Sequence, residues 1–367
     1  DIKNNNMEHP ENNEQYTGLT VNSGVEQPPQ VNPYLKLQKR KRMMTSGEFV
    51  EGILKGDITV LSRAVTLVES QVPEHQAIAQ EVIEKCLPHA GNSRRIGITG
   101  VPGAGKSTSI DVFGLHVLRD GGKLAVLAID PSSERTKGSI LGDKTRMEKL
   151  SIHPNAFIRP SPSAGSLGGV ARKTRETIVL CEAAGYNNIF VETVGVGQSE
   201  TAVHSMVDFF LLIQLAGTGD ELQGIKRGIM EMADGIVINK ADGDNIDRAM
   251  LAKAQFQSAL HLFPPTTSEV LTYSGYYELG IKEVWEMIDR YFAYVKGNGF
   301  FEQRRMAQEK YWMYETIDEQ LKANFYRDEE IEAMLKLKEN NVLDCRQSSF
   351  VAAREVLDFY FAKHGLK

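Results

Sequence analysis

Cysteine is scarce in this chain of 367 residues, which contains three of them and no Cys-x-x-Cys pair. An odd and scattered set argues against a disulfide framework and favours a reducing compartment such as the cytoplasm. The eight histidines are dispersed, so a zinc site built from closely spaced His and Cys residues is not expected. Cys181 lies in the apolar run "TIVLCEAAG" and is interpreted as a buried space-filling residue instead of a nucleophile.

Two further absences concern membranes and nucleic acids. No apolar run approaches the ~20 residues that cross a bilayer, and the first residues lack the basic start and apolar core of a secretion signal. The formal net charge of -6 argues against a nucleic-acid binder held by phosphate contacts. The one basic cluster, Lys39 to Arg42, is interpreted as the solvated start of a helix. We therefore expect a cytoplasmic protein that binds neither nucleic acid nor membrane.

The first quarter of the chain changes character near residue 45. Residues 1–45 are rich in Asn, Gln, Glu and Pro and offer little apolar surface to bury, so we predict a disordered tail. Residues 46–92 carry apolar side chains at helical spacing, and Asp57 is placed to cap one of the helices. The last helix of this N-terminal helical segment is predicted to end at Gly91.

Between residues 93 and 297 short apolar runs alternate with helical segments. The runs are "RRIGIT", "KLAVLAI", "NAFIRP", "NNIFVE", "DFFLLIQL", "GIVIN" and "EVLTY". Near-continuous apolar strands that alternate with helices are typical of an α/β fold, in which helices flank both faces of a mostly parallel sheet. Residues 298–367 mix aromatic and charged residues at helical spacing. They are interpreted as a C-terminal helical arm for packing or dimerisation.

The segment "GVPGAGKST" follows the first apolar run and matches the pattern GxxxxGK[ST]. Glycines allow the backbone to turn its N–H groups toward an anion, and the helix that begins there directs its positive dipole end to the same point. Lys106 is predicted to reach the β- and γ-phosphates, and the hydroxyl of Ser107 to bind Mg²⁺. The predicted phosphate-binding residues are Gly100, Val101, Pro102, Gly103, Ala104, Gly105, Lys106, Ser107 and Thr108.

The segment "INKAD" follows the apolar run "GIVI" and indicates which base is bound. Asn239, Lys240 and Asp242 fit the guanine-specifying pattern NKxD. A carboxylate accepts both the N1–H and the N2–H of guanine, whereas adenine would leave it unpaired, and discrimination of this kind can reach about 10⁴. We therefore expect GTP and GDP as ligands. A later strand-end loop, "TYSGYY", would by its position alone place three more residues beside the base: Ser274, Gly275 and Tyr276.

An acidic residue at the end of a buried strand is the third element expected around a nucleotide. The segment "NNIFVETVGVGQ" supplies Glu192, with Gly195 three residues later, where Ras-type GTPases have the Asp of DxxG. Glu192 is predicted to hold a Mg²⁺-bound water, and the N–H of Gly195 to sense the γ-phosphate. Gln198 stands three places beyond Gly195, so its part in orienting the attacking water stays open.

Five segments together resemble one family. "GVPGAGKST", "DPSSERTKGSILGDKTRM", "VETVGVGQSE", "GTGDELQGIKRGIMEMAD" and "INKADGD" look like the methylmalonyl-CoA mutase-associated GTPases, the MeaB/ArgK group that includes human MMAA. The likeness runs from about Ser46 to about Tyr294 and continues more loosely beyond. It implies a P-loop GTPase of the metallochaperone class, with helical extensions at both ends, which hydrolyses GTP slowly with Mg²⁺ and forms a homodimer through its C-terminal arm.

The resemblance also implies a partner and further site residues. Family members are chaperones of adenosylcobalamin-dependent acyl-CoA mutases, notably methylmalonyl-CoA mutase; they gate cofactor loading, remove damaged cofactor and protect the enzyme. The position matching Asp130 ends the second strand, that of Asp143 lies in the first switch, and that of Lys226 lies in an additional switch that relays the nucleotide state to the mutase. Mg²⁺ prefers carboxylates and waters, so the implied metal residues are Ser107, Asp130, Asp143 and Glu192. The implied catalytic residues are Lys106, Asp130, Asp143, Glu192 and Lys226.

The sequence alone leaves alternatives for two site assignments and for the function. Asp130 could instead start a turn before Pro131, and "SGYY" stands where family members commonly have Ser-Ala. No arginine is placed as a finger in cis, a group that can be worth about 10³–10⁵ in rate, so we predict slow intrinsic turnover. A nickel-delivering metallochaperone is one alternative, although the chain lacks the His-rich tract it would need. A small-molecule kinase or transport-linked ATPase is another, against which Asp242 argues.

Overall fold

The computed structural model describes the chain in seven stretches, residues 42–119, 121–129, 147–160, 167–193, 199–216, 227–261 and 268–365. Residues 1–41, for which we predicted disorder, lie outside the described residues.

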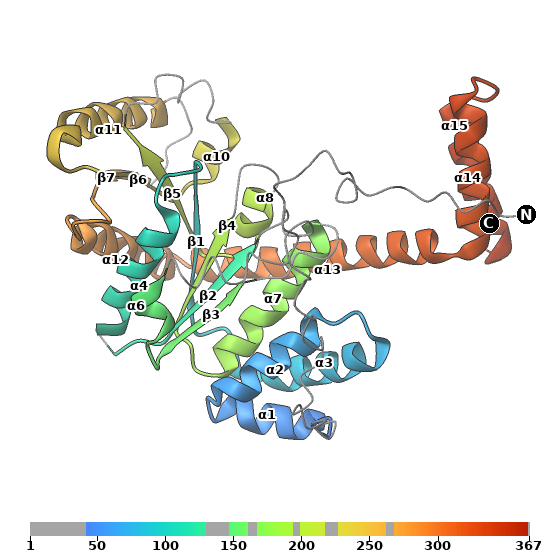
Figure 1. The fold of residues 1–367 in the computed structure, drawn as a ribbon, viewed down its shortest axis with the longest axis horizontal. Helices are drawn as coiled ribbons and strands as arrows, with labels where there is room; N and C mark the ends of the chain where they lie inside the picture. The colour runs from blue at the N-terminus through green and yellow to red at the C-terminus, as the bar shows by residue number, and fades with distance from the viewer. Residues whose placement is uncertain are drawn as a thin grey trace, which may run out of the picture. The chain divides into compact units, whose positions relative to one another are not determined.

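Seven strands form a single sheet in which every neighbouring pair runs parallel. Their order across the sheet is β3-β2-β4-β1-β5-β6-β7 (Figure 1). Each strand coincides with one of the seven apolar runs, so the predicted α/β fold with a mostly parallel sheet flanked by helices is confirmed. The strands are β1 (Arg94–Gly100), β2 (Leu124–Ile129), β3 (Ala156–Pro160), β4 (Asn188–Thr193), β5 (Phe209–Leu215), β6 (Gly235–Asn239) and β7 (Glu269–Thr272).

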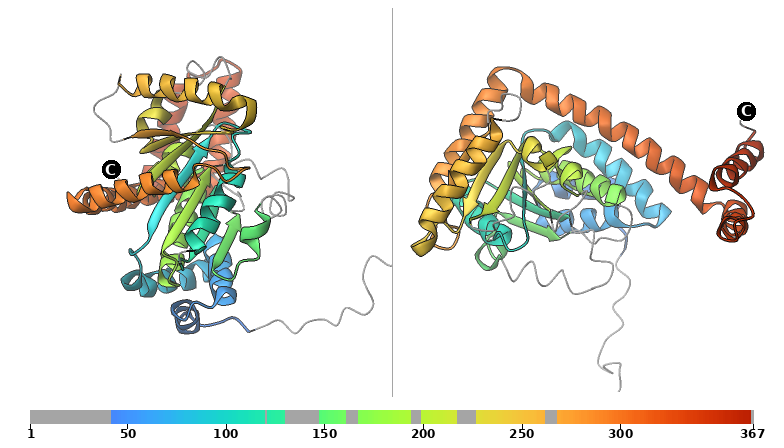
Figure 2. Two further views of the ribbon diagram at one scale, coloured as in Figure 1. Left: turned by 90° about the vertical axis from the view of Figure 1, so that its left-hand side faces the viewer. Right: turned by 90° about the horizontal axis from the view of Figure 1, so that it is seen from above.

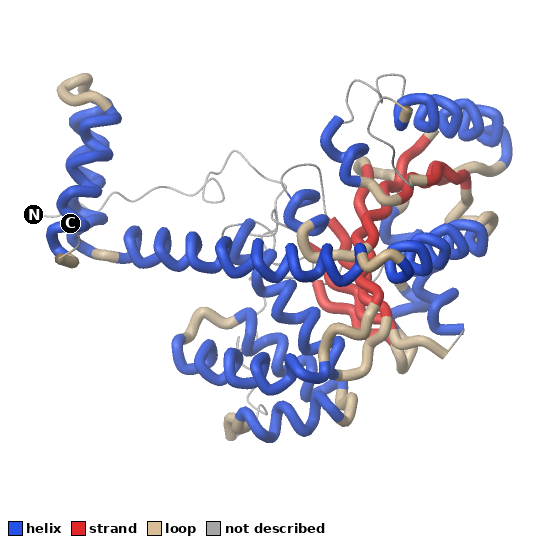
Figure 3. The backbone as a smooth tube through the Cα atoms, turned by 180° about the vertical axis from the view of Figure 1, so that it is seen from behind, coloured by secondary structure: helices blue, strands red, loops and turns tan. Residues whose placement is uncertain are grey.

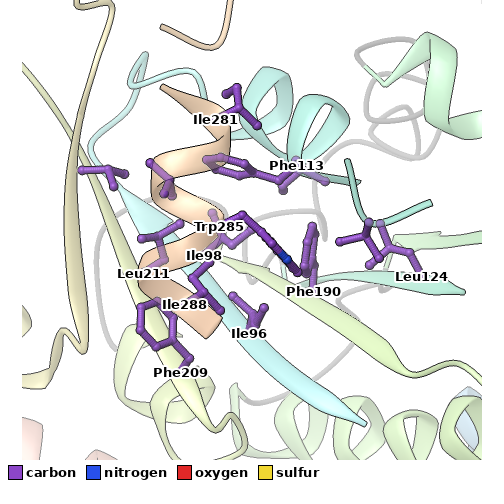
Figure 4. Close-up of a cluster of buried hydrophobic side chains, with 14 of the residues drawn as sticks. Ile96, Ile98, Phe113, Leu124, Phe190, Phe209, Leu211, Ile281, Trp285 and Ile288 are labelled. Carbon is purple, nitrogen blue, oxygen red and sulfur yellow. The ribbon is translucent and has the colours of Figure 1, made fainter. Parts of the chain in front are cut away.

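The larger core lies between one face of the sheet and helices α4 (Lys106–Arg119) and α12 (Ile281–Gly297), with the short α6 (Glu148–Ser151) packed on α4. Figure 4 shows Trp285 and Ile288 of α12 lying against Ile96 and Ile98 of β1. Side chains on a strand alternate between the two faces. In β5, the three odd-numbered residues from Phe209 to Ile213 therefore join this core. The core fixes the first helix after β1, and with it the loop between them.

The second core covers the other face of the sheet near β5, β6 and β7. Leu212 of β5 and Ile238 of β6 pack there against Phe256 of α11. The helices that contact the sheet on this face are α7 (Leu167–Ala183), α8 (Ser199–His204), α10 (Arg227–Met232) and α11 (Ile246–Leu260). Cys181 of α7 is fully buried, and burial raises the pKa of its thiol, as expected for a space-filling residue.

Three N-terminal helices pack against α7: α1 (Ser46–Leu54), α2 (Ile58–Glu69) and α3 (Pro73–Cys86). The side chain of Asp57 caps α2 by accepting from the N–H of Thr59 at 2.8 Å, as predicted. The prediction that the last of these helices ends at Gly91 is wrong, because α3 ends at Cys86 and is followed by a 3₁₀ turn, Leu87–His89. Pro88 lacks the N–H that a continued α-helix requires.

The C-terminal region consists of α13 (Phe300–Arg327), α14 (Glu329–Leu343) and α15 (Ser349–Lys363). Figure 2 and Figure 3 show α13 as one long helix that runs past α7. Its inner side is buried at Gln308 and Trp312, and the indole N–H of Trp312 donates to the carbonyl of Ser205 at 3.0 Å. Helices α14 and α15 pack on each other and on the end of α13. Within the described ranges, no helix has the length and apolar character needed to span a membrane.

Candidate functional site

The segment "GVPGAGKST" forms a loop between the carboxyl end of β1 and the amino end of α4. Two of its glycines are required by their surroundings. Gly100 has φ +155°, and a Cβ there would lie 2.1 Å from the carbonyl oxygen of Ile213. Gly105 has φ +86°, and a Cβ there would lie 2.6 Å from Nδ2 of Asn239. The loop therefore runs close against two neighbouring strand ends and starts a helix at Lys106.

The ammonium group of Lys106 lies over this loop. Its Nζ donates to the carbonyl of Gly100 at 2.8 Å and reaches that of Val101 at 3.4 Å. Burial lowers the pKa of Lys106, and the negative charges of Glu192 and Glu200 act in the opposite direction. A cation thus lies on the loop, close enough to the carboxylates of β4 and α8 for their charges to act on it.

Asn239, at the end of β6, joins three loops. The side chain is 3% exposed, and its Nδ2 donates to the carbonyl of Ala104 in the glycine-rich loop at 2.7 Å. Its Oδ1 accepts from the backbone N–H of Lys240 at 2.7 Å and from that of Gly275 at 3.0 Å. One amide therefore holds the glycine-rich loop, the "NKAD" segment and the "SGYY" loop together at the carboxyl edge of the sheet.

Asp242 and Ser274 are also in direct contact. The hydroxyl of Ser274 donates to Oδ2 of Asp242 at 2.5 Å and accepts from the backbone N–H of Tyr277 at 3.2 Å. Lys240 adopts φ +59°, and its carbonyl accepts from the side chain of Asn245 at 2.7 Å. Tyr276, which was predicted beside the base, has a side chain that is 80% exposed. The structure thus brings Asp242, Ser274 and the Gly275 backbone together and leaves the Tyr276 ring in solvent.

Glu192 lies on β4 between β1 and β2, opposite Ile98 and Ala128. It is 5% exposed, and the next residue, Thr193, donates through its hydroxyl to that of Thr99 on β1 at 2.9 Å. A hydroxyl from Ser107 and a carboxylate from Glu192 are hard oxygen donors of the kind Mg²⁺ prefers, so the described part of the predicted metal set fits this ion.

Several predicted residues lie outside the described ranges: Asp130, Asp143, Gly195, Gln198 and Lys226. Among the residues that are described, no group of three or more His, Cys, Asp or Glu side chains could hold a metal ion.

Two features near the loop were missed from the sequence. Glu200, in the first turn of α8, is 2% exposed, and its charge acts on Lys106. Its only signal was an acidic residue shortly after "VETVGVGQ", which on its own also fits an ordinary helix start. The second is the pair Ser109 and Tyr273, whose hydroxyl oxygens lie 2.5 Å apart. No motif marks these two residues, because they meet only when α4 and the end of β7 are packed together.

A protein-family model matches most of the chain. This model, described as "Methylmalonyl Co-A mutase-associated GTPase MeaB", matches residues 61–330, which include the segments "GVPGAGKST" and "INKAD". The chain belongs to the MeaB family. The resemblance predicted from the five sequence segments is therefore confirmed, and so is the prediction that this MeaB-family chain is a GTPase.

Relatives of the MeaB-family chain agree with this assignment. A probable GTPase of Mycobacterium bovis is 47% identical over 307 residues, covering 83% of this chain and 91% of the relative. The mouse "Methylmalonic aciduria type A homolog, mitochondrial" is 42% identical over 327 residues, covering 85% and 79%. A crystal structure titled "LAO/AO transport system kinase" has a TM-score of 0.70 and 36% identity, covering 87% of this chain and 99% of that one. The fold and the family are thus shared over most of the length.

Proposed function

We propose that the chain is a GTP-hydrolysing chaperone of an adenosylcobalamin-dependent acyl-CoA mutase, methylmalonyl-CoA mutase, and that it gates cofactor loading and protects or reactivates the mutase. The match to the mutase-associated GTPase family over residues 61–330 carries this proposal. The joining of the phosphate loop and both base loops by Asn239 is consistent with it, since one nucleotide could contact all three. The name of the mouse relative, which refers to methylmalonic aciduria, points to the same substrate chemistry.

In this proposal residues Gly100 to Thr108 hold the phosphates. The positive end of α4 and the ammonium of Lys106, which lies at the loop, would offset the phosphate charge. Mg²⁺, when bound, would neutralise charge that develops on the transferred phosphoryl group. Ser107 and Glu192 would hold it from the described side of the site, together with Asp130 and Asp143 as the resemblance implies. Lys226 would complete the site when its switch moves, and intrinsic turnover is accordingly slow.

The base is assigned to Asp242, with Asn239 and Lys240 shaping the loop and Ser274, Gly275 and Tyr276 on the facing side. Ser274 donates to one carboxylate oxygen of Asp242, which orients the carboxylate toward a donor pair on guanine. Asp242→Ala should remove the preference for GTP over ATP, whereas Asp244→Ala, an exposed acid two residues away, should leave it intact. Titration of both nucleotides into each variant measures this. Equal binding of GTP and ATP by the wild type would reject the base assignment.

The same titration decides between this proposal and its kinase alternative. The solved structure that resembles this chain is titled a transport system kinase, and a small-molecule kinase or transport-linked ATPase would bind ATP at least as well as GTP. The nickel-delivery alternative has less support, because it would need a His-rich tract or a Cys/His metal pair, and the sequence has neither.

The homodimer is proposed from the outer side of α13. Apolar side chains recur there at spacings of seven and four residues, which places them on one face of the helix, away from buried Gln308 and Trp312. These exposed residues are Met306, Met313, Ile317 and Leu321. Ile317→Lys should convert a dimer to monomers in light scattering after gel filtration, and Asp318→Lys, on the neighbouring exposed position, should not. A monomeric wild type would contradict the dimer.

Association with the mutase can be tested directly. Purified methylmalonyl-CoA mutase should co-elute with the chain in a manner that differs between GDP and a non-hydrolysable GTP analogue. Asp143→Ala should bind GDP nearly as well as the wild type and lose that difference. Absence of a complex in every nucleotide state would reject the chaperone function.

The three cysteines, which are all free thiols, support the further proposal that the protein works in the reducing cytoplasm.

A further inference from the structure

A chain of buried hydroxyl groups connects the phosphate loop to the strand end before the guanine loop. The hydroxyl oxygen of Tyr273 lies 2.5 Å from Oγ of Ser109, and that Oγ lies 2.8 Å from the carbonyl oxygen of Gly105. Ser109 and Tyr273 are 0% and 2% exposed. Neither residue belongs to a nucleotide-binding motif, yet their contact links α4 to the end of β7, directly before the "SGYY" loop.

The direction of these hydrogen bonds follows from the number of protons. A carbonyl oxygen can only accept, so the single hydroxyl proton of Ser109 is used toward Gly105. The Tyr273 hydroxyl must then donate to Ser109. Burial raises the pKa of Tyr273, so the phenol stays protonated and remains a donor. The resulting order is Tyr273 to Ser109 to Gly105.

The backbone of Tyr273 completes the connection on the other side. Its N–H donates to the carbonyl of Ile238 at 2.9 Å, and its carbonyl accepts from the N–H of Ala241 at 3.0 Å. Its ring stacks on Phe113 of α4 with centroids 5.5 Å apart and planes 29° from parallel. Tyr273 is therefore held by β6 and the "NKAD" segment through its backbone, and by Ser109 and Phe113 of α4 through its side chain.

We propose that Tyr273 is a positioning residue that fixes the span between the phosphate loop and the base loops, so that one guanine nucleotide engages both at once. The inference rests on the base role proposed above for Asp242. Two sites that bind parts of one ligand cooperate only when their separation matches the ligand.

The test removes one hydroxyl group and compares whole and partial ligands. Tyr273→Phe keeps the ring that stacks on Phe113 and removes the bond to Ser109. The Kd for GDP should rise about five- to tenfold, the loss expected for one buried hydrogen bond. The Kd values for guanosine and for inorganic pyrophosphate, each of which engages one end of the site, should stay unchanged. Ser109→Ala removes the same bridge from the helix side, so the double variant should be no weaker than either single variant.

Tyr291→Phe is the matched control. Tyr291 belongs to the same apolar core and donates its hydroxyl to Asp234 at 3.0 Å, away from the glycine-rich loop. Tyr291→Phe should lower the Tm at least as much as Tyr273→Phe, because the lost hydrogen bonds involve charged groups, and it should leave the Kd for GDP unchanged. The proposal is overturned if Tyr273→Phe and Ser109→Ala bind GDP like the wild type. It is also overturned if the affinities for guanosine and pyrophosphate fall as much as the affinity for GDP. If Asp242→Ala itself fails to weaken GDP, the base assignment falls instead.

Discussion

Around strands β1, β5, β6 and β7, the two edges of the seven-stranded sheet are stabilised by different kinds of interaction. At the carboxyl edge, the loops that follow β1, β6 and β7 are joined mainly by bonds between neutral groups, with Asn239 and the pair Ser109 and Tyr273 at the centre. At the amino edge, one buried and two half-buried ion pairs join the starts of the strands to helices: Arg95 with Glu182, Arg305 with Asp208 and Arg304 with Asp234.

The difference fits the nucleotide site proposed at the carboxyl edge. A frame of backbone groups, amides and hydroxyls would leave the charged groups of such a site available for the ligand. The amino edge anchors α13 and binds no proposed ligand. Ion pairs there can serve only to hold strands and helices together. Removal of one partner would leave the charge of the other uncompensated.

The largest effect is expected at the amino edge. Glu182 accepts from Arg95 at 2.8 and 2.9 Å, from Ser93 at 2.5 Å and from the N–H of Gly91 at 2.7 Å. Glu182→Met leaves a buried guanidinium without its carboxylate and should lower the free energy of unfolding by about 3–5 kcal/mol, as measured by urea titration. The double variant Arg95→Met with Glu182→Met should recover much of the loss. A change in GDP affinity in the folded variant would show that the edges are not independent.

A smaller effect on stability, with a larger one on binding, is expected at the carboxyl edge. Gly100→Ala would push a Cβ to 2.1 Å from the Ile213 carbonyl, and overpacking of this kind costs about 1–3 kcal/mol. Gly103→Ala meets nothing within 4 Å at φ +79° and should cost about 1 kcal/mol from backbone strain alone. Calorimetric GDP titration should show a loss of affinity in Gly100→Ala beyond that in Gly103→Ala. Equal losses would mean that loop position matters less than backbone conformation.

The "SGYY" loop has Ser274 and Gly275 where members of the family commonly have Ser-Ala, and the effect of this difference can be tested. A Cβ at Gly275 would make ordinary contacts, at 3.6 Å from Oδ1 of Asn239 and 3.7 Å from Thr108, and no positive φ is required there. Gly275→Ala should therefore stabilise the fold by about 0.4–1 kcal/mol, through a less flexible unfolded chain. A lower Tm in this variant would show that the loop is packed more tightly than these distances indicate.

The smallest effect concerns pH and the anchoring of α13. Burial lowers the pKa of His204, as does the charge of Arg304, while Asp234 acts to raise it. A guanidinium only donates, so His204 accepts from Arg304 through Nε2 at 3.1 Å as a neutral ring. Its stabilising contribution is present above the ordinary His pKa of about 6.5 and is lost as the pH falls below that value. The Tm of the wild type should drop more than that of His204→Gln between about pH 7.5 and 5.5; parallel curves would contradict this.

The sequence predicted the strands of the fold more completely than the residues of the candidate site. All seven strands were found, because a fully buried parallel strand is an apolar run that composition reveals directly. The end of α3 was placed too far along, since the helical pattern outlasts the effect of Pro88. Glu200 and Tyr273 were not singled out, because the groups they act on, Lys106 and Ser109, are distant along the chain and come close only in the folded protein. Asp130, Asp143 and Lys226 stay predictions.

By itself, the sequence determined the class of fold, the glycine-rich loop and the family to which the "NKAD" segment belongs, since each depends on residue type and short-range spacing. Only the tertiary structure decided that Asn239 joins three loops, that Tyr273 reaches Gly105 through Ser109, and that Arg95, Arg304 and Arg305 form ion pairs at the opposite edge of the sheet. The physical reason is the range of the interactions. Backbone turning and strand burial act within a few residues, whereas hydrogen bonds between strand ends exist only after the sheet has brought those ends together.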